Sequence, residues 1–158
     1  MECMSTGETW QTHSTSSNET ELLGEKIGQS FRGGETIELV SDLGGGKTTF
    51  VRGLAKGMGS VDKVASPSFT IKREYYTADL AMHHFDFHRL HEPGEMLHDL
   101  AEVVKQPTNI VVVEWADKVQ GVLPAKRLTV TIKPTGETAR QFTFTYPKEL
   151  AYLVKGAK

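Results

Sequence analysis

The sequence predicts an α/β protein: a three-layer sandwich in which helices cover a mixed, mostly parallel central sheet, with a β-hairpin towards the C-terminus. Helical and β-rich segments alternate along the chain, as they do in such folds. Residues 110–113 form a continuous apolar run that is followed by the carboxylate of Glu114, which is typical of a parallel strand covered on both faces. In residues 127–132 and 141–146, polar residues alternate with β-branched or aromatic ones. The turn sequence Pro134-Thr-Gly136 lies between them, which indicates the hairpin. The 158 residues, 38% of them hydrophobic, suffice for one buried core.

The N-terminal part predicts a tail followed by a helix. Residues 1–17 are polar and lack apolar periodicity, so we expect a flexible tail in which only Trp10 can dock. A single domain is then expected over residues 18–158. Asn18 and Glu21 suit a helix start, and the helix should end near Gly33-Gly34. Its apolar face consists of Leu23, Ile27 and Phe31.

The middle of the chain predicts a strand, a helix and a hairpin. Residues 36–40 form a short β-rich run, and the next segment has helical apolar spacing until about Gly57 and Gly59. Residues 69–76 and 80–87 should pair as strands, because aromatic and β-branched residues recur in both. Pro93 suits the first turn of a further helix, whose apolar positions are Met96, Leu97, Leu100, Val103 and Val104.

Between the strand at 36–40 and its following helix lies a glycine-rich turn that predicts a phosphate-binding loop, and with it a P-loop NTPase fold. Successive glycines let backbone N–H groups point inward at a helix N-terminus, where an anion is favoured. Lys47 supplies a mobile charge for the β- and γ-phosphates, and Thr48 supplies a hydroxyl for Mg²⁺. Ser41 stands where the G-x-x-x-x-G-K-[ST] pattern has its first glycine. The predicted ATP-binding residues are Asp42, Leu43, Gly44, Gly45, Gly46, Lys47, Thr48 and Thr49.

Two carboxylates follow predicted strands and are candidates for catalysis. Glu114 ends the apolar strand at 110–113, where an acid normally meets Mg²⁺ directly or through water. Asp86 ends the strand that contains His83 and His84. In an open α/β sheet ligands bind beyond the carboxyl ends of the strands. We therefore predict Lys47, Asp86 and Glu114 as catalytic residues, and Thr48 and Glu114 as metal ligands.

Other features allow two interpretations each. The histidines between positions 83 and 98 are either zinc ligands or solvated or switch-region side chains, and zinc is disfavoured because neighbouring strand residues point to opposite faces and no second cysteine completes a site. Ser66-Pro-Ser-Phe-Thr70 is either a segment that senses the γ-phosphate or a simple turn. Arg89 is either a transition-state or partner contact or an ordinary surface arginine. Trp115 is either an interface anchor or a core residue.

Several of these motifs together resemble a known family. They are Ser41 to Leu54, Ser66 to Thr70, Glu74-Tyr75, His84-Phe-Asp-Phe-His-Arg-Leu90 and Glu114-Trp115. Their order and spacing resemble the bacterial tRNA threonylcarbamoyladenosine biosynthesis ATPase family, TsaE or YjeE, over about residues 18–140. The chain departs from the family pattern at Ser41, at Ser68 in place of Thr, and at His88 in place of Tyr.

The resemblance implies a small P-loop ATPase that acts with the TsaB and TsaD proteins. Its cycle of ATP and ADP, with Mg²⁺, would support modification of adenosine 37 in certain tRNAs. Lys47, Thr48, Asp86 and Glu114-Trp115 match the functional residues of the family. The residues alone predict Mg-nucleotide binding and hydrolysis, and the tRNA pathway follows from the resemblance.

Bulk properties narrow the possible surroundings and partners. The formal net charge of −2 provides no global attraction to tRNA, which we expect to be reached only through the complex, or to a membrane. Cys3 has no intramolecular partner, and the N-terminus lacks a signal-peptide pattern. We therefore expect a cytoplasmic protein.

Two other function classes remain open at this stage. A small-molecule kinase should carry a mobile lid with arginines, whereas the chain ends in a predicted hairpin. A nucleotide-gated binding module would bind ATP without appreciable turnover. A GTPase is disfavoured, because no Asn-Lys-x-Asp segment is present.

Overall fold

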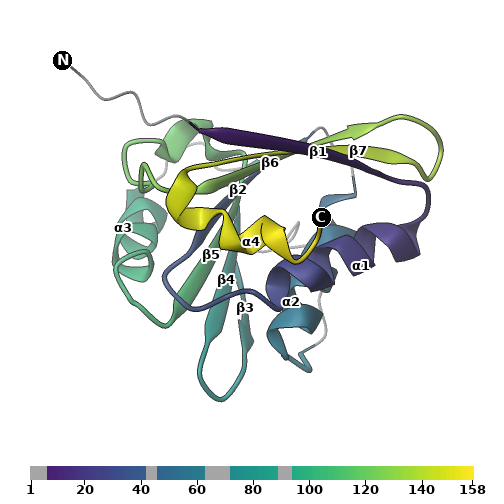
Figure 1. Cartoon of the computed structure of the whole chain (residues 1–158). Helices are drawn as coiled ribbons and strands as arrows, with labels where there is room; N and C mark the ends of the chain where they lie inside the picture. Colours follow the sequence, from purple (N-terminus) through teal and green to yellow (C-terminus); the bar gives the residue numbers. More distant parts are fainter. Residues whose placement is uncertain (1–6, 42–45, 63–71, 89–93) are drawn as a thin grey trace.

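A mixed seven-stranded sheet organises the computed structural model, which describes residues 7–41, 46–62, 72–88 and 94–158 (Figure 1). The strand order is β1-β7-β6-β2-β5-β4-β3. The strands are β1 (Glu8–Ser14), β2 (Thr36–Val40), β3 (Lys72–Tyr76), β4 (Ala81–Asp86), β5 (Asn109–Glu114), β6 (Leu128–Pro134) and β7 (Arg140–Tyr146). The helices are α1 (Ser17–Gly28), α2 (Lys47–Met58), α3 (Gly94–Val103) and α4 (Tyr152–Lys155), with 3₁₀ turns η1 (Ala116–Val119) and η2 (Lys148–Leu150).

The centre of the sheet is parallel and its flanks are antiparallel. Strands β6, β2, β5 and β4 run parallel to one another, whereas β1, β7 and β3 each pair antiparallel with a neighbour. Among the described strands, three of the six pairings are parallel. The prediction of a mixed sheet is therefore confirmed, but "mostly parallel" is correct only for the four central strands.

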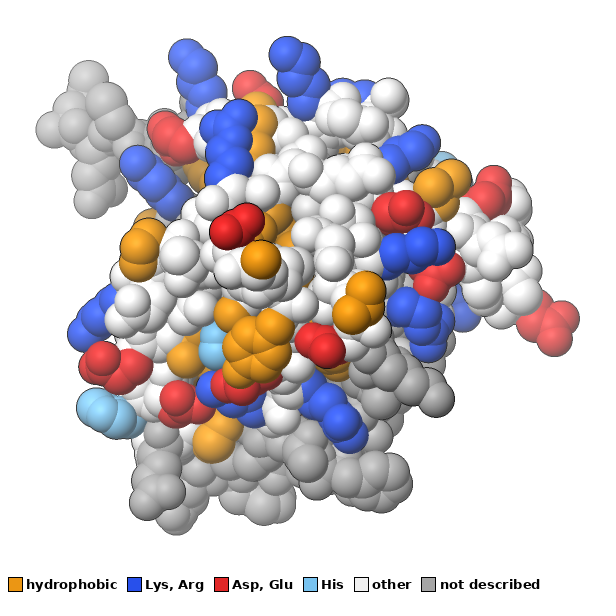
Figure 2. All heavy atoms as spheres, turned by 90° about the horizontal axis from the view of Figure 1, so that it is seen from below, with side chains coloured by type: hydrophobic (Ala, Val, Ile, Leu, Met, Phe, Trp, Pro, Cys, Tyr) orange, Lys and Arg blue, Asp and Glu red, His pale blue; other side chains and the backbone are white. Residues whose placement is uncertain are grey.

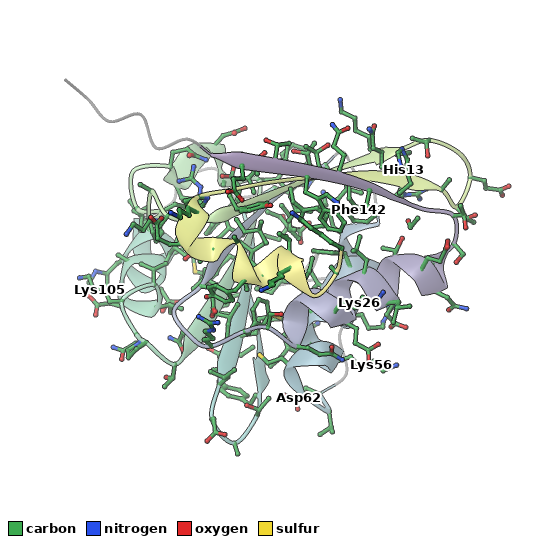
Figure 3. The ribbon with its side chains drawn as sticks, in the orientation of Figure 1. His13, Lys26, Lys56, Asp62, Lys105 and Phe142 are labelled. Atoms are coloured by element: carbon green, nitrogen blue, oxygen red, sulfur yellow. The ribbon has the colours of Figure 1, made fainter. Side chains whose placement is uncertain are left out.

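Side chains of β5 alternate between two hydrophobic cores, which confirms helices on both faces. Ile110 and Val112 pack with α1, α2 and α4, whereas Val111 and Val113 pack with α3 and η1. All four side chains are essentially unexposed, as expected for a strand that is covered on both sides. On the first face, Phe142 of β7 points towards the helices (Figure 3), with its ring centroid 5.5 Å from that of Phe50 in α2.

Glycines bring α1 and α2 into unusually close contact. A Cβ atom built on Gly53 of α2 would lie 2.1 Å from the carbonyl oxygen of Glu21 in α1, and one built on Gly24 would lie 2.3 Å from that of Phe50. No real Cβ fits at such distances, so glycine is required where the two backbones meet. This packing determines where the N-terminus of α2 lies relative to the sheet.

The expected flexible tail over residues 1–17 is wrong for Glu8–Ser14, which form β1. This edge strand pairs in register with β7, from Glu8 opposite Tyr146 to Ser14 opposite Arg140. The ring of Trp10 stacks on that of Phe144, with 5.2 Å between centroids. Backbone pairing with β7 stabilises a strand whose outer face is polar, so the hydrophobic pattern was too weak to predict it. The folded domain therefore begins before residue 18.

Helix α1 starts and ends earlier than predicted. Ser16, not Asn18, is the N-cap, and its hydroxyl accepts a hydrogen bond from the backbone N–H of Glu19 at 3.1 Å. The Glu19 carboxylate in turn accepts from the N–H of Thr15 at 2.7 Å, which completes a capping pair two residues upstream of the predicted one. The helix ends at Gly28 rather than near Gly33.

The other predicted elements agree with the structure where it describes them, whereas residues 69–71 of the predicted strand and Pro93 of the predicted helix lie outside the described residues. Gly59 terminates α2 in a left-handed conformation, with φ of 98°. Strands β3 and β4 form the predicted antiparallel pair, β5 is a central parallel strand, and β6 and β7 form the predicted hairpin. Helix α3 buries Leu100 and Val103 against the second core.

Candidate functional site

Strand β2 and helix α2 flank the glycine-rich turn as predicted. Gly46 precedes α2 with φ of 94°, a left-handed conformation that favours glycine, and Lys47 is the first residue of the helix. Thr48 and Thr49 follow in its first turn and are partly buried. Asp42, Leu43, Gly44 and Gly45 lie outside the described residues, so their predicted role in binding a nucleotide stays a prediction.

Lys47 is buried at the carboxyl edge of the sheet, with 8% of its surface exposed. Its Nζ donates a hydrogen bond to the carbonyl oxygen of Ser41 at 3.1 Å and lies 3.5 Å from Oε1 of Glu114. The same nitrogen is 5.2 Å from the ring centroid of Trp115. The lysine of the turn and the acid of β5 are thus in direct contact, as the parallel arrangement of β2 and β5 predicts.

The two predicted carboxylates lie side by side. Strands β4 and β5 are parallel, and their register places Asp86 directly opposite Glu114. Glu114 is buried, with 4% of its surface exposed, whereas Asp86 is partly exposed. Oδ1 of Asp86 accepts a hydrogen bond from the backbone N–H of His88 at 3.0 Å. The structure therefore brings Lys47, Asp86 and Glu114 together at the carboxyl ends of the parallel strands.

His84 of β4 is a site residue that the sequence interpretation missed. It is fully buried, and its Nε2 forms a short hydrogen bond with Oε2 of Glu114. Burial alone would raise the pKa of Glu114, but the hydrogen bond from His84 and the charges of His84 and Lys47 hold it below its ordinary value. His84 is two residues before Asp86 in the same strand, so period-two alternation already puts both on one face.

Trp115 has a strained backbone next to the site. With φ of 57° it is the only non-glycine residue of the described chain with positive φ, and it follows Glu114 directly. Its ring centroid lies 4.8 Å from that of His88. Such conformations cost about 1–3 kcal/mol and cluster at functional sites. Trp115 is partly buried and packs against the second hydrophobic core, which favours the core interpretation, whereas its role as an interface anchor stays a prediction.

A pocket of about 310 Å³ is lined by Ser41, whose carbonyl oxygen accepts from Lys47, by Trp115, which follows Glu114, and by residues of β6. It opens at the carboxyl ends of β2 and β6 and next to the turn after β5. Its lining residues are Glu38, Leu39, Val40, Ser41, Trp115, Ala116, Asp117, Thr131, Ile132, Lys133 and Pro134. This volume lies at the small end of ordinary ligand pockets.

Arg140, at the start of β7, is a second residue that the sequence interpretation missed. Its Nη1 donates hydrogen bonds to the carbonyl oxygens of Ala139 at 2.8 Å and Gly136 at 3.2 Å. A Cβ atom built on Gly46 would lie 3.4 Å from its Nε, so the guanidinium group lies against the end of the glycine-rich turn. Only the strand order, with β7 two strands from β2, brings it there.

Several sequence-based candidates receive no structural description. Ser66 to Thr70 and Arg89 lie outside the described residues, and their roles stay predictions.

His83 and His84 do face opposite sides of β4, since His83 contacts Glu74 and His84 contacts Glu114. Among the residues with described positions, no three His, Cys, Asp or Glu side chains form a group that could hold a metal ion. No helix in those same ranges has the length and apolar character needed to cross a membrane.

Comparison with known proteins identifies relatives across most of the chain. Residues 14–142 match the family model of the threonylcarbamoyl adenosine biosynthesis protein TsaE. The tRNA threonylcarbamoyladenosine biosynthesis protein TsaE of Bacillus subtilis (strain 168) is 36% identical over 136 residues, covering 86% of this chain and 84% of the relative. The protein of the same name from Treponema pallidum (strain Nichols) is 30% identical, covering 82% of this chain and 96% of the relative.

A solved structure has the same architecture. The crystal structure of Bacillus subtilis YdiB superposes with a TM-score of 0.76 and 29% sequence identity, covering 96% of this chain and 95% of that one. The overall fold is therefore shared with a solved structure. Together with the family match and the sequence relatives, this likeness shows that the chain belongs to the TsaE family of threonylcarbamoyl adenosine biosynthesis proteins.

Proposed function

We propose that this chain is a Mg²⁺-dependent ATPase of the P-loop class that acts with the TsaB and TsaD proteins in forming N6-threonylcarbamoyladenosine at position 37 of tRNA. Family membership supports the pathway. The contact between Lys47 and Glu114 carries the ATPase part of the proposal. A buried lysine at a helix N-terminus, facing an acid at the end of the adjacent parallel strand, is the arrangement that binds and activates nucleotide phosphates in this class.

The residues at this edge fit ATP and Mg²⁺. Lys47 and the first N–H groups of α2 provide positive charge for phosphate oxygens. Mg²⁺ commonly takes one or two protein oxygens together with substrate phosphates, so the hydroxyl of Thr48 and the carboxylate of Glu114 form a sufficient protein share. When bound, Mg²⁺ neutralises charge on the phosphates. The pocket beside Trp115 is where we propose that the base and ribose lie.

Each residue then has a separate task. Lys47 moves from Glu114 to the phosphates and follows their charge during transfer. Glu114, which its surroundings keep ionised, orients water or supports Mg²⁺. Asp86, which lies opposite Glu114 on the neighbouring strand β4, likewise orients water or supports Mg²⁺. Gly46 and the rest of the turn hold the phosphates through backbone N–H groups.

We further propose that tRNA is reached through the complex and that the protein works in the cytoplasm. The face shown in Figure 2 has Lys and Arg side chains interspersed with Asp and Glu, and its described residues form no large patch of positive charge. With a formal net charge of −2, long-range attraction to tRNA is weak. Recognition of tRNA by the partner proteins avoids the need for a basic surface here.

Phosphate release tests this function. The protein should release phosphate slowly from Mg-ATP when alone, because phosphoryl transfer gains roughly 10³–10⁵ in rate from a placed arginine and we expect partners to complete the site. Addition of TsaB and TsaD from the same organism should raise the rate at least about tenfold, a modest part of that gain. A fast rate that the partners leave unchanged would favour a stand-alone hydrolase or kinase. Nucleotide binding without phosphate release under any condition would favour a binding module.

A further inference from the structure

We propose that His84 is a positioning residue for this site: it holds one oxygen of Glu114 while the other passes from Lys47 to the Mg-nucleotide. The inference rests on the proposed function. Each oxygen of Glu114 has its own partner, since Oε1 lies 3.5 Å from Nζ of Lys47 and Oε2 is hydrogen-bonded to Nε2 of His84. The exposed fractions of the three residues are 0% for His84, 4% for Glu114 and 8% for Lys47.

Burial makes the second partner necessary. A buried carboxylate that loses its only charged partner destabilises the folded protein, because the interior replaces little of the hydration that the charge has in water. Lys47 is the partner that must leave when phosphates arrive. If Glu114 had Lys47 alone, nucleotide binding would strand a buried negative charge until Mg²⁺ or water reached it. With His84 in place, Glu114 stays paired and oriented throughout.

The position of His84 in the central part of the sheet suits it to hold Glu114. Its backbone is in register with Val112 of β5 and Arg73 of β3, so the strand is fixed on both sides. A carboxylate only accepts hydrogen bonds, so Nε2 is the donor. The other ring nitrogen, Nδ1, is buried and has no hydrogen-bond partner among the described residues. Glu114 is therefore the polar group that the described structure provides for His84.

Two substitutions separate positioning from general damage. In His84→Gln the side-chain amide reaches about as far as Nε2 and can still donate to Glu114, whereas in His84→Asn the shorter amide reaches only about as far as Nδ1. Loss of a residue that orients a ligand or catalytic group typically costs about 10–100-fold in activity or metal affinity. We expect His84→Asn to lower kcat for phosphate release at least about tenfold, and His84→Gln to stay within about threefold of wild type. The KM for Mg-ATP should change little in His84→Gln and should rise in His84→Asn, because slow turnover makes KM follow the weaker Mg²⁺-dependent binding.

Binding provides a readout that does not depend on turnover. Calorimetric titration should give similar affinity for ADP without Mg²⁺ in wild type and both variants, because Lys47 and the turn are intact. The gain in ADP affinity on adding Mg²⁺ should shrink at least about tenfold in His84→Asn and be largely retained in His84→Gln. His83→Gln, in the same strand but facing α3, is the matched control and should behave as wild type in these titrations. Thermal unfolding confirms that each variant folds.

The outcomes are distinct. Wild-type binding of Mg-ADP with equal Mg²⁺ gains and equal kcat in both His84 variants would overturn the positioning role and leave the proposed function intact. Equal losses in His84→Gln and His84→Asn that extend to ADP without Mg²⁺ would also overturn it, since they would indicate a merely structural residue. If wild type itself binds no Mg-nucleotide, the proposed function fails and the inference fails with it.

Discussion

Gly46 shows how a single backbone conformation positions the candidate site. Its φ of 94° lies where residues with a Cβ pay about 1–2 kcal/mol, and Arg140 packs against the space that a Cβ would need. Gly46→Ala should lower the free energy of unfolding by about that amount and weaken ADP binding, because the start of α2 must shift. Gly121→Ala, where a Cβ would meet nothing within 4 Å, is the control. Chemical denaturation and nucleotide titration measure both effects, and equal results for the two variants would remove Gly46 from the account.

Glu114 and Asp86 differ in burial and should differ in effect. Glu114→Gln keeps the shape but removes the charge that Lys47 and His84 hold in place, so phosphate release should fall by about 10²-fold or more. Asp86→Asn should lower the rate less, because its carboxylate is more exposed and is held by one described backbone contact. Steady-state rates with Mg-ATP compare them. Glu102→Gln, on an exposed part of α3, should match wild type. Wild-type rates of phosphate release in both Glu114→Gln and Asp86→Asn would show that these acids have only a structural role.

At the scale of elements, the glycine contact between α1 and α2 determines where Lys47 lies. A Cβ on Gly53 would overlap the Glu21 carbonyl, so Gly53→Ala must push the helices apart. Overpacking of this kind typically costs about 1–3 kcal/mol. We expect that loss in urea denaturation, together with weaker nucleotide binding, since α2 carries Lys47. Wild-type stability in Gly53→Ala would contradict the close contact.

Strand β4 should make stability depend on pH through His83. Burial lowers the pKa of His83 below its ordinary value of 6.5, and the charge of Lys72 lowers it further against the opposing effect of Glu74. As pH falls, His83 therefore takes up a proton more readily in the unfolded chain than in the folded chain. The free energy of unfolding should consequently fall as pH drops through about 6.5. Asp99 of α3 and Asn109 of β5 also face this imidazole, but burial is the largest cause.

Denaturation of wild type and His83→Asn between pH 7.5 and 5.5 measures this contribution. The variant should lose stability less steeply than wild type as pH falls. His13→Asn, on the outer face of β1 (Figure 3), removes an exposed histidine and should leave the slope unchanged. Equal slopes in all three proteins would show that His83 contributes nothing to the pH dependence.

Elements with a strong local signal were predicted correctly, and those stabilised mainly by pairing were not. The continuous apolar run of β5 and the helical spacing of α2 each require burial, which a sequence pattern reveals. Strand β1 has only Trp10 as an apolar anchor, and its partner β7 lies more than a hundred residues away. The early start of α1 depends on a hydroxyl cap at Ser16, for which the nearby Asn18 is an equally good candidate from sequence.

For the whole molecule, sequence predicted which residues meet at the candidate site better than it predicted what surrounds them. Lys47, Asp86 and Glu114 meet because parallel strands place their carboxyl ends at one edge, a rule that needs no coordinates. The pocket and Arg140 depend on β6 and β7 lying beside β2 rather than elsewhere, and no local pattern encodes that order. Simple alternation along β4 already places His84 on the same face as Asp86, but the sequence interpretation considered it only as a zinc ligand or as a solvated or switch-region histidine.

Calorimetric titration with Mg-ATP tests the central claim, that this edge of the sheet binds a nucleotide through Lys47, most directly. Wild type should bind, and Lys47→Ala should lose at least about tenfold in affinity, because the charge that follows the phosphates is gone. Lys56→Ala, at the exposed far end of the same helix (Figure 3), should bind as wild type does. Wild-type affinity in Lys47→Ala, or no binding by wild type, would contradict the account.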